Sequence, residues 1–83
     1  MIGHSLRHDG ISTPHQRLYI RTLMRQLDLD TRYVTGAHRR FFEAAGISPE
    51  PNSGIDPVLC NLTKSKASAL ISALKKEVPD EQQ

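Results

Sequence analysis

Cysteine and tryptophan are scarce in this chain, which has one cysteine, Cys60, and no tryptophan. A single cysteine cannot form an internal disulfide, and its presence agrees with a reducing compartment. No apolar run approaches the roughly 18 residues of a membrane-spanning helix. The opening MIGHSLRHDG also lacks the apolar stretch of a signal peptide. We therefore expect a cytoplasmic protein that has no membrane partner.

The apolar content is low for a folded domain. Leu, Ile, Val and Phe together make up 20 of the 83 residues, just above the range of disordered chains. A chain of this length forms one small domain. We expect a single helical domain over residues 13–78. It should lie between a flexible arm at 1–12, which shows no apolar period, and a flexible acidic tail at 79–83. The first 10 residues of the arm are expected to be dispensable for folding.

The clearest helix signal lies in TPHQRLYIRTLMRQLDLD. Thr13 can cap the first turn, Pro14 suits the first helical position, and Gln16 completes a capping box. Apolar residues then recur at helical spacing, and we expect the helix to end near Asp28. In LTKSKASALISALKK, Thr63 is the predicted N-cap of a closing helix.

The middle helix has an uncertain start and a well-marked end. Thr31 and Thr35 are both candidate N-caps, and we favour Thr35. Gly46 fits a left-handed C-cap, with Ile47 placed for the accompanying hydrophobic contact. The proline-rich segment 47–57 that follows is a predicted loop. Asp56 and Pro57 at its end are expected to begin a short helical turn.

No strand pattern or internal repeat appears, so the predicted fold is all-α, with three main helices and a short extra turn. A start at Thr31 would leave a connection short enough for a helix-turn-helix, whereas a start at Thr35 makes it too long. The expected core comprises apolar residues from all the predicted helical segments. They are Leu18, Leu23, Leu27, Phe41, Leu59, Leu62, Leu70, Ile71 and Leu74.

The chain lacks the patterns of an enzyme, a cofactor site or a metal site. It has no paired-carboxylate cluster, no Gly-rich phosphate loop and no nucleophile motif, so we do not expect catalysis. Cys60 stands between leucines and is expected to be a small buried hydrophobe. The four histidines, His4, His8, His15 and His38, have no cysteine or carboxylate spacing that would complete a metal site.

Basic charge gathers in the middle of the chain, although the net charge is only +2. Arg17, Arg21 and Arg25 recur every four residues on one predicted helix. Like charges at this spacing cost about 0.2 to 0.5 kcal/mol per pair, and Arg25 alone has an acid nearby in sequence, Asp28. The stripe is either an ordinary solvated face or a surface for an anionic partner.

A second basic group follows on the middle helix, where His38, Arg39 and Arg40 extend the candidate binding surface. Because neighbouring helical positions diverge by about 100°, one of Phe41 and Phe42 is expected near the surface, as a contact candidate.

Residues 13 to 29 and 62 to 76 resemble the opening and closing helices of small helical domains in tailed-phage proteins. The resemblance rests on two features of the sequence. One is the threonine and glutamine of TPHQ, and the other is the pattern Leu-Thr-x-x-x-Ala-Ser-x-Leu-Ile. Such domains occur in Mu-like phage regulatory proteins and in C-terminal modules of phage recombination proteins. The chain departs from the pattern by lacking a recombinase core and by carrying Lys66 where an acid is usual. The resemblance implies a phage or mobile-element accessory protein in a bacterial host cell.

Two functions therefore remain open at this point. The first, which the composition slightly favours, is a small regulator that binds nucleic acid through the basic helical face. The second is an interaction module that binds an acidic surface of a host or phage protein through the same face, without nucleic acid.

Overall fold

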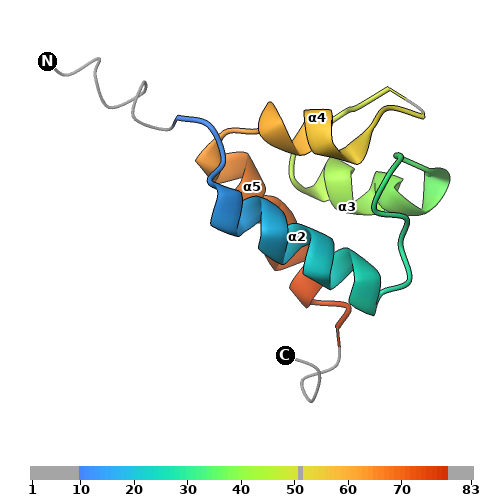
Figure 1. Ribbon diagram of the computed structural model, residues 1–83. Helices are drawn as coiled ribbons and strands as arrows, with labels where there is room; N and C mark the ends of the chain where they lie inside the picture. Colours follow the sequence, from blue (N-terminus) through green and yellow to red (C-terminus); the bar gives the residue numbers. More distant parts are fainter. Residues whose placement is uncertain (1–9, 51, 79–83) are drawn as a thin grey trace, which may run out of the picture.

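Helices dominate the computed structural model, which describes residues 10–50 and 52–78 (Figure 1). The predicted all-α fold, with three main helices and a short extra one, is confirmed. In chain order the elements are α2 (Pro14–Gln26), the 3-10 turn η1 (Gly36–His38), α3 (Arg39–Ala44), α4 (Ile55–Cys60) and α5 (Lys64–Lys75).

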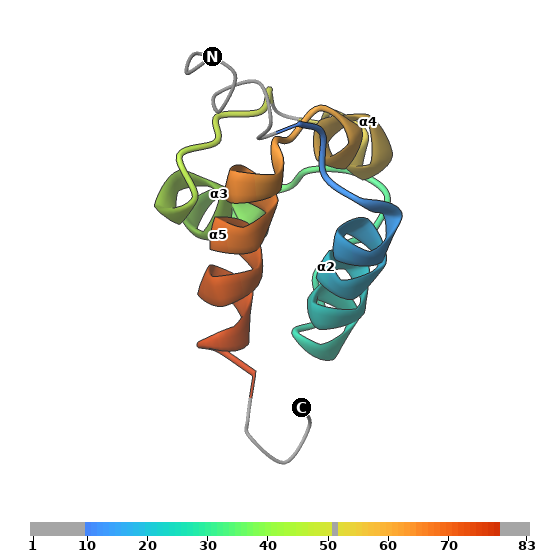
Figure 2. The ribbon, with the colours of Figure 1, turned by 90° about the vertical axis from the view of Figure 1, so that its left-hand side faces the viewer.

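The framework of the fold is the pair α2 and α5, which lie side by side and run in the same direction (Figure 2). α4 lies at the end where both helices begin, and α3 packs against α5. Hydrogen bonds tie the two starting ends together. The Gln16 side chain donates to the Lys64 carbonyl at 3.3 Å, and the Ser12 N–H donates to the Leu62 carbonyl at 2.8 Å.

The described part of the predicted N-terminal arm is packed rather than free. Ser12 is buried, its hydroxyl donates to the Leu59 carbonyl at 2.6 Å, and Gly10 accepts a bond from the Lys64 N–H at 3.0 Å. Residues 10–12 therefore pack with the domain rather than with the expected flexible arm, because their backbone groups pair with the segment that precedes α5. Residues 1–9 of the arm and the predicted tail 79–83 lie outside the described residues.

Both ends of α2 follow from local chemistry. The predicted capping box is confirmed. The Gln16 N–H donates to the Thr13 hydroxyl and the Thr13 N–H donates to the Gln16 side-chain oxygen, each at 3.0 Å. At the other end Asp28 takes the left-handed conformation, with φ 60°. The Leu29 N–H then reaches the Met24 carbonyl at 2.8 Å and closes the last turn.

The middle helical segment begins after Thr35, as favoured, through the turn η1 that leads into α3. The connection from Gln26 is thus too long for a helix-turn-helix, and that possibility is not realised. At the far end Gly46 has φ 75°, and its N–H and that of Ile47 reach the Glu43 and Phe42 carbonyls at 3.0 and 2.8 Å. These bonds confirm the predicted C-cap as a complete Schellman motif.

The short helix α4 exists but begins earlier than expected. Gly54, not Asp56, is its N-cap, and no side chain caps it. The Ile55 N–H is instead paired with the Arg32 carbonyl at 2.8 Å, since residues 32–34 and 52–55 form a small extended pairing. This tertiary pairing sets the start of the helix, so the capping preference of Asp56 does not decide it.

Six of the nine predicted core residues are buried, and several other expectations are corrected. Leu18 is 57% exposed, and Cys60 is exposed as well. Phe41 and Phe42 are both buried, so neither is a surface contact candidate. Leu27 and Ile71 are only partly buried against the core. The buried apolar residues of the described chain are Ile20, Leu23, Met24, Val34, Phe41, Phe42, Ala45, Ile47, Ile55, Leu59, Leu62, Ala67, Leu70, Leu74 and Val78.

The position of Leu18 has a simple geometric cause. The buried residues of α2 are Ile20, Leu23 and Met24, which lie within one arc of the helix. Leu18 is two positions before Ile20, which places it about 200° around the helix axis on the opposite side. The helix therefore has apolar residues on both faces, and packing against α5 selects which face is covered.

Candidate interaction surface on α2

His38 is buried and serves the fold, which corrects its assignment to the binding surface. Only 1% of the residue is exposed. Its Nδ1 accepts the Thr35 N–H at 2.9 Å, and its Nε2 lies 2.7 Å from the Asp30 carbonyl oxygen. This arrangement fits the neutral ring that carries its hydrogen on Nε2. The ring also stacks on Phe42, with centroids 5.9 Å apart, so it is unavailable to a partner.

Two arginines of the predicted stripe have partners inside the protein. Arg17 donates to the carbonyl of Ser12 and, at 3.3 Å, to its hydroxyl. Arg21 forms an ion pair with Asp56 at the start of α4. Tertiary contacts therefore offset the repulsion that the α2 sequence leaves uncompensated. These partners come from segments before α2 and far after it, so the α2 sequence carried no sign of the pairing.

Arg25 differs from the other two arginines. It is exposed, and no ion pair reaches it within residues 10–50 and 52–78. Helical spacing places it on the same face as three other residues, Leu18, Arg21 and Thr22. We call this set, Leu18, Arg21, Thr22 and Arg25, the outer α2 face.

The outer α2 face combines an exposed apolar residue, Leu18, with basic residues further along the helix. Leu18 is more than half exposed, although burying a leucine side chain fully is worth about 1.5 to 3 kcal/mol. The Thr22 hydroxyl donates back to the Leu18 carbonyl at 3.0 Å, so it competes little for an external partner. Arg25 supplies positive charge two turns further along the helix, whereas Arg21, one turn along, is paired with Asp56. The face can therefore offer an apolar contact and a charge-assisted hydrogen bond together.

The remaining predicted site residues, Arg39 and Arg40, point toward other neighbours. The Arg39 Nε atom lies 3.9 Å from an oxygen of Glu43, a loose and exposed pair. The Arg40 Nη2 atom lies 3.5 Å from a carboxylate oxygen of Glu77, which follows the end of α5. The guanidinium carbon of Arg40 lies over the Phe41 ring, 4.5 Å from its centroid. Arg40 thus shields a core aromatic. The predicted basic residues therefore do not form one surface. Arg21 pairs with α4, and Arg40 pairs with the residue Glu77 that follows α5.

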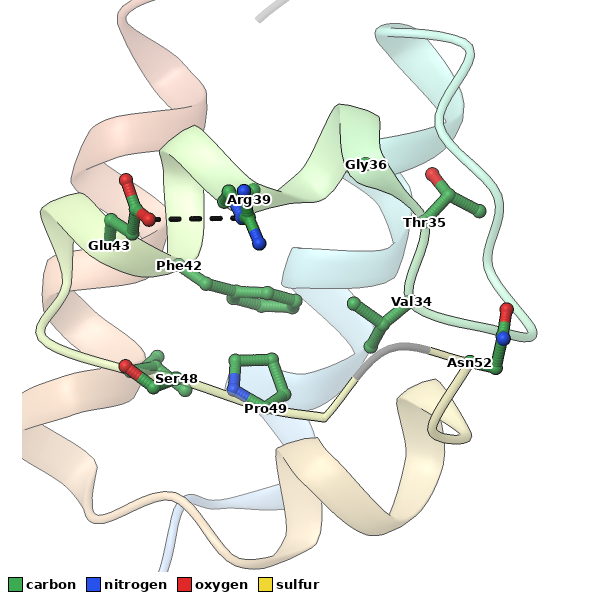
Figure 3. Close-up of a pocket in the computed structure, with 10 residues that line it drawn as sticks. Val34, Thr35, Gly36, Arg39, Phe42, Glu43, Ser48, Pro49 and Asn52 are labelled. Atoms are coloured by element: carbon green, nitrogen blue, oxygen red, sulfur yellow. Dashed lines mark ion pairs between the residues drawn. The ribbon is translucent and has the colours of Figure 1, made fainter.

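A hollow of about 390 Å³ opens between α3 and the segment 47–52 (Figure 3). Phe42 and Val34 form its apolar floor, and Pro49 faces them from the opposite segment. The Arg39–Glu43 ion pair spans its rim. The charged residues of its lining, Arg39 and Glu43, are exposed and pair with each other.

The connection beside this hollow contains a carboxylate with a clear structural role. The Asp30 side chain accepts the backbone N–H groups of Arg32 at 2.6 Å and Tyr33 at 3.1 Å. These bonds favour the ionised form and hold the pKa of Asp30 below its ordinary value of 3.8. The carboxylate fixes the turn that leads into the 32–34 pairing, and no feature of it points to catalysis.

Within the described ranges, no group of three or more His, Cys, Asp or Glu side chains could hold a metal ion. Over the same residues, no helix has the length and apolarity needed to cross a membrane. Comparison of the chain with protein-family models, curated proteins and solved structures found no match. The function is therefore inferred from the residues themselves.

Sequence reasoning found the arginines of the outer α2 face but missed Leu18 at its N-terminal end. A signal was present, because Leu18, Tyr19, Ile20, Leu23 and Met24 occupy more of the helix circumference than one core can cover. One of them had to be exposed, and the arginine positions mark the exposed side. We expected Leu18 to be buried because its side chain is apolar, and that expectation was wrong.

Proposed function

We propose that the protein is an interaction module that binds an acidic segment of another protein through the outer α2 face. The observation that carries this proposal is the exposure of Leu18, at 57%, on the same face as Arg21 and the unpaired Arg25. This combination suits a protein interface, because interface cores are more apolar than the rest of the surface and interfaces are enriched in arginine.

Charge indicates what kind of partner can cover this face. The α2 sequence PHQRLYIRTLMRQ carries three arginines and no acid. A second copy of the chain, packed α2 against α2, would place arginines against arginines, and such like-charge contacts oppose self-association. A partner with acidic side chains beside an apolar anchor would satisfy both Leu18 and Arg25.

An amphipathic helix is the simplest segment with this chemistry. Leu18 and Arg25 are seven residues apart, so they lie about 10.5 Å from each other along the helix axis. A partner helix with an apolar residue and an acid separated by one heptad matches this spacing. If the chain is a phage accessory protein, as the resemblance of its first and last helices implies, the partner belongs to the phage or its host.

Nucleic-acid binding is the second candidate, and one observation favours it. The basic residues Arg25, Arg32, Lys64 and Lys76 are exposed, and no ion pair neutralises them in the described part of the chain. They lie on different elements, however, and Leu18 gives a phosphate backbone nothing to bind.

Two fluorescent probes separate these functions. One is a 20-residue amphipathic peptide with leucine and glutamate in heptad spacing, and the other is a 20-nucleotide oligo-dT strand. We expect the peptide to bind and the oligonucleotide to bind far more weakly at physiological salt, as measured by fluorescence anisotropy. Leu18→Ala should weaken peptide binding about tenfold, and Arg25→Gln about two- to fivefold.

Matched variants control for general effects of apolarity and charge. Ile11→Ala removes a side chain of similar exposure, 56%, that lies outside α2. Lys76→Gln removes a positive charge at the end of α5. Both should leave peptide affinity unchanged. Tight oligonucleotide binding that depends on Arg25 but not on Leu18 would favour the nucleic-acid function instead.

A further inference from the structure

We infer that Asp56 keeps the nucleic-acid affinity of the outer α2 face low by occupying Arg21. The inference rests on the proposed function in one respect only, namely that this face is where the protein meets its partners. It assigns a specificity role to a residue of α4, outside the helix that carries the binding surface.

The geometry of the pair supports this assignment. Arg21 is the middle residue of the stripe, and its guanidinium contacts the Asp56 carboxylate. The Arg21 side chain is 29% exposed and Asp56 is 66% exposed, so the carboxylate is the more accessible partner. Any anion that approaches Arg21 therefore meets the negative charge of Asp56 as well.

Asp56 is held in this position by the backbone around it. The preceding Ile55 is fully buried, and its N–H is bonded to the Arg32 carbonyl at 2.8 Å. The start of α4 is thus fixed against the segment that follows α2. Asp56 therefore lies in the first turn of a helix whose start is fixed by a backbone hydrogen bond.

The consequence differs for the two classes of partner. A nucleic acid gains affinity by placing successive phosphates on successive cations, with release of counterions at each contact. Arg17 is turned toward Ser12 and Arg21 is neutralised, so Arg25 is left as the one arginine of α2 with no described partner. A protein partner that is anchored on Leu18 needs fewer cations. A repulsive element of this kind is a common source of specificity.

The test compares Asp56→Asn with the wild-type chain in binding oligo-dT of 20 nucleotides, over a series of salt concentrations. Release of Arg21 should raise affinity at low salt about two- to fivefold. It should also steepen the dependence of log affinity on log salt by about 0.7, the value for one added single-strand contact. Combining Asp56→Asn with Arg21→Gln should remove both changes.

Two further variants control for misfolding and for the general effect of removing a negative charge. Asp56→Ser keeps a polar residue in the first turn of α4 and should repeat the result if the asparagine variant folds poorly. Glu50→Gln removes an equal charge from an exposed position elsewhere and should have no effect. Thermal melts by circular dichroism establish that each variant is folded.

The inference is overturned if Asp56→Asn and Asp56→Ser leave oligo-dT binding and its salt dependence unchanged, or if binding stays undetectable at low salt. It is also overturned if the gain persists without Arg21, or if Glu50→Gln produces the same gain. The proposed function is judged separately, by peptide binding to the wild-type chain and its loss in Leu18→Ala. Either idea can therefore fail while the other stands.

Discussion

The imidazole of His38 joins two backbone groups, since Nδ1 accepts the Thr35 N–H at 2.9 Å and Nε2 lies 2.7 Å from the Asp30 carbonyl. This ring holds the connection after α2 against the start of α3. His38→Ala should therefore cost on the order of 2 to 5 kcal/mol, because it leaves a cavity and an unpaired N–H.

Two conservative variants of His38 separate its two bonds. Asparagine can replace Nδ1 as an acceptor, and glutamine can replace Nε2 as a donor, so each should retain part of the stability lost in His38→Ala. Chemical denaturation measures the free energy of unfolding. If all three variants were as stable as the wild-type protein, the ring would not hold this connection.

A matched pair of leucine truncations tests the assignment of core and surface. Leu70 is fully buried and Leu18 is 57% exposed. Leu70→Ala should cost about 2 to 5 kcal/mol, whereas Leu18→Ala should change stability by less than about 0.5 kcal/mol. Thermal or urea unfolding gives both values. Equal losses in the two variants would mean that the packed face of α2 is misassigned.

Two helix ends have a residue in the left-handed conformation. Introducing glycine at one and removing it from the other should change stability in opposite directions. Asp28 has φ 60° although it carries a side chain, and Gly46 has φ 75° with open space around its α-carbon. Asp28→Gly should stabilise the protein by about 1 kcal/mol, and Gly46→Ala should destabilise it by a similar amount. Asp28→Ala is the control, since it removes the charge but keeps the Cβ atom that disfavours the left-handed conformation. A gain as large in Asp28→Ala would assign the effect to charge rather than to backbone strain.

The turn at Asp30 predicts a dependence of stability on pH. Because backbone hydrogen bonds lower the pKa of this carboxyl in the folded state, its contribution is present above about pH 3.8 and is lost as pH falls through the lowered value. Asp30→Asn should be less stable than wild type at neutral pH, and the difference should shrink below pH 4. A difference that stayed constant from pH 7 to pH 2 would contradict this role.

Local chemistry explains which features were predictable from sequence. The caps at Thr13, Thr35, Thr63 and Gly46 depend on residues within one or two turns, and all four were placed correctly. The start of α4 was misplaced because a bond from Ile55 to Arg32 sets it. Contacts of that kind join segments far apart in sequence, and no local pattern reveals them.

The candidate site shows the same division. Spacing alone put Arg17, Arg21 and Arg25 on one side of a helix, and that arrangement holds. Arg17 bonds to Ser12 just before the helix, and Arg21 pairs with the distant Asp56, so the sequence overstated how much of the charge is free. His38 looked like part of a basic surface because His-Arg-Arg is contiguous, yet the turn η1 directs its ring inward.

The most direct test of the binding proposal is a two-dimensional ¹H–¹⁵N NMR titration of the labelled protein with the amphipathic leucine-glutamate peptide. We predict that the largest amide shifts fall on residues 18–25 of α2, and that Leu18→Ala with Arg25→Gln moves the titration to far higher peptide concentrations. At physiological salt, titration with oligo-dT should leave those amides nearly unchanged. The account would be contradicted if the peptide moved no α2 amides, or if oligo-dT moved them more than the peptide does.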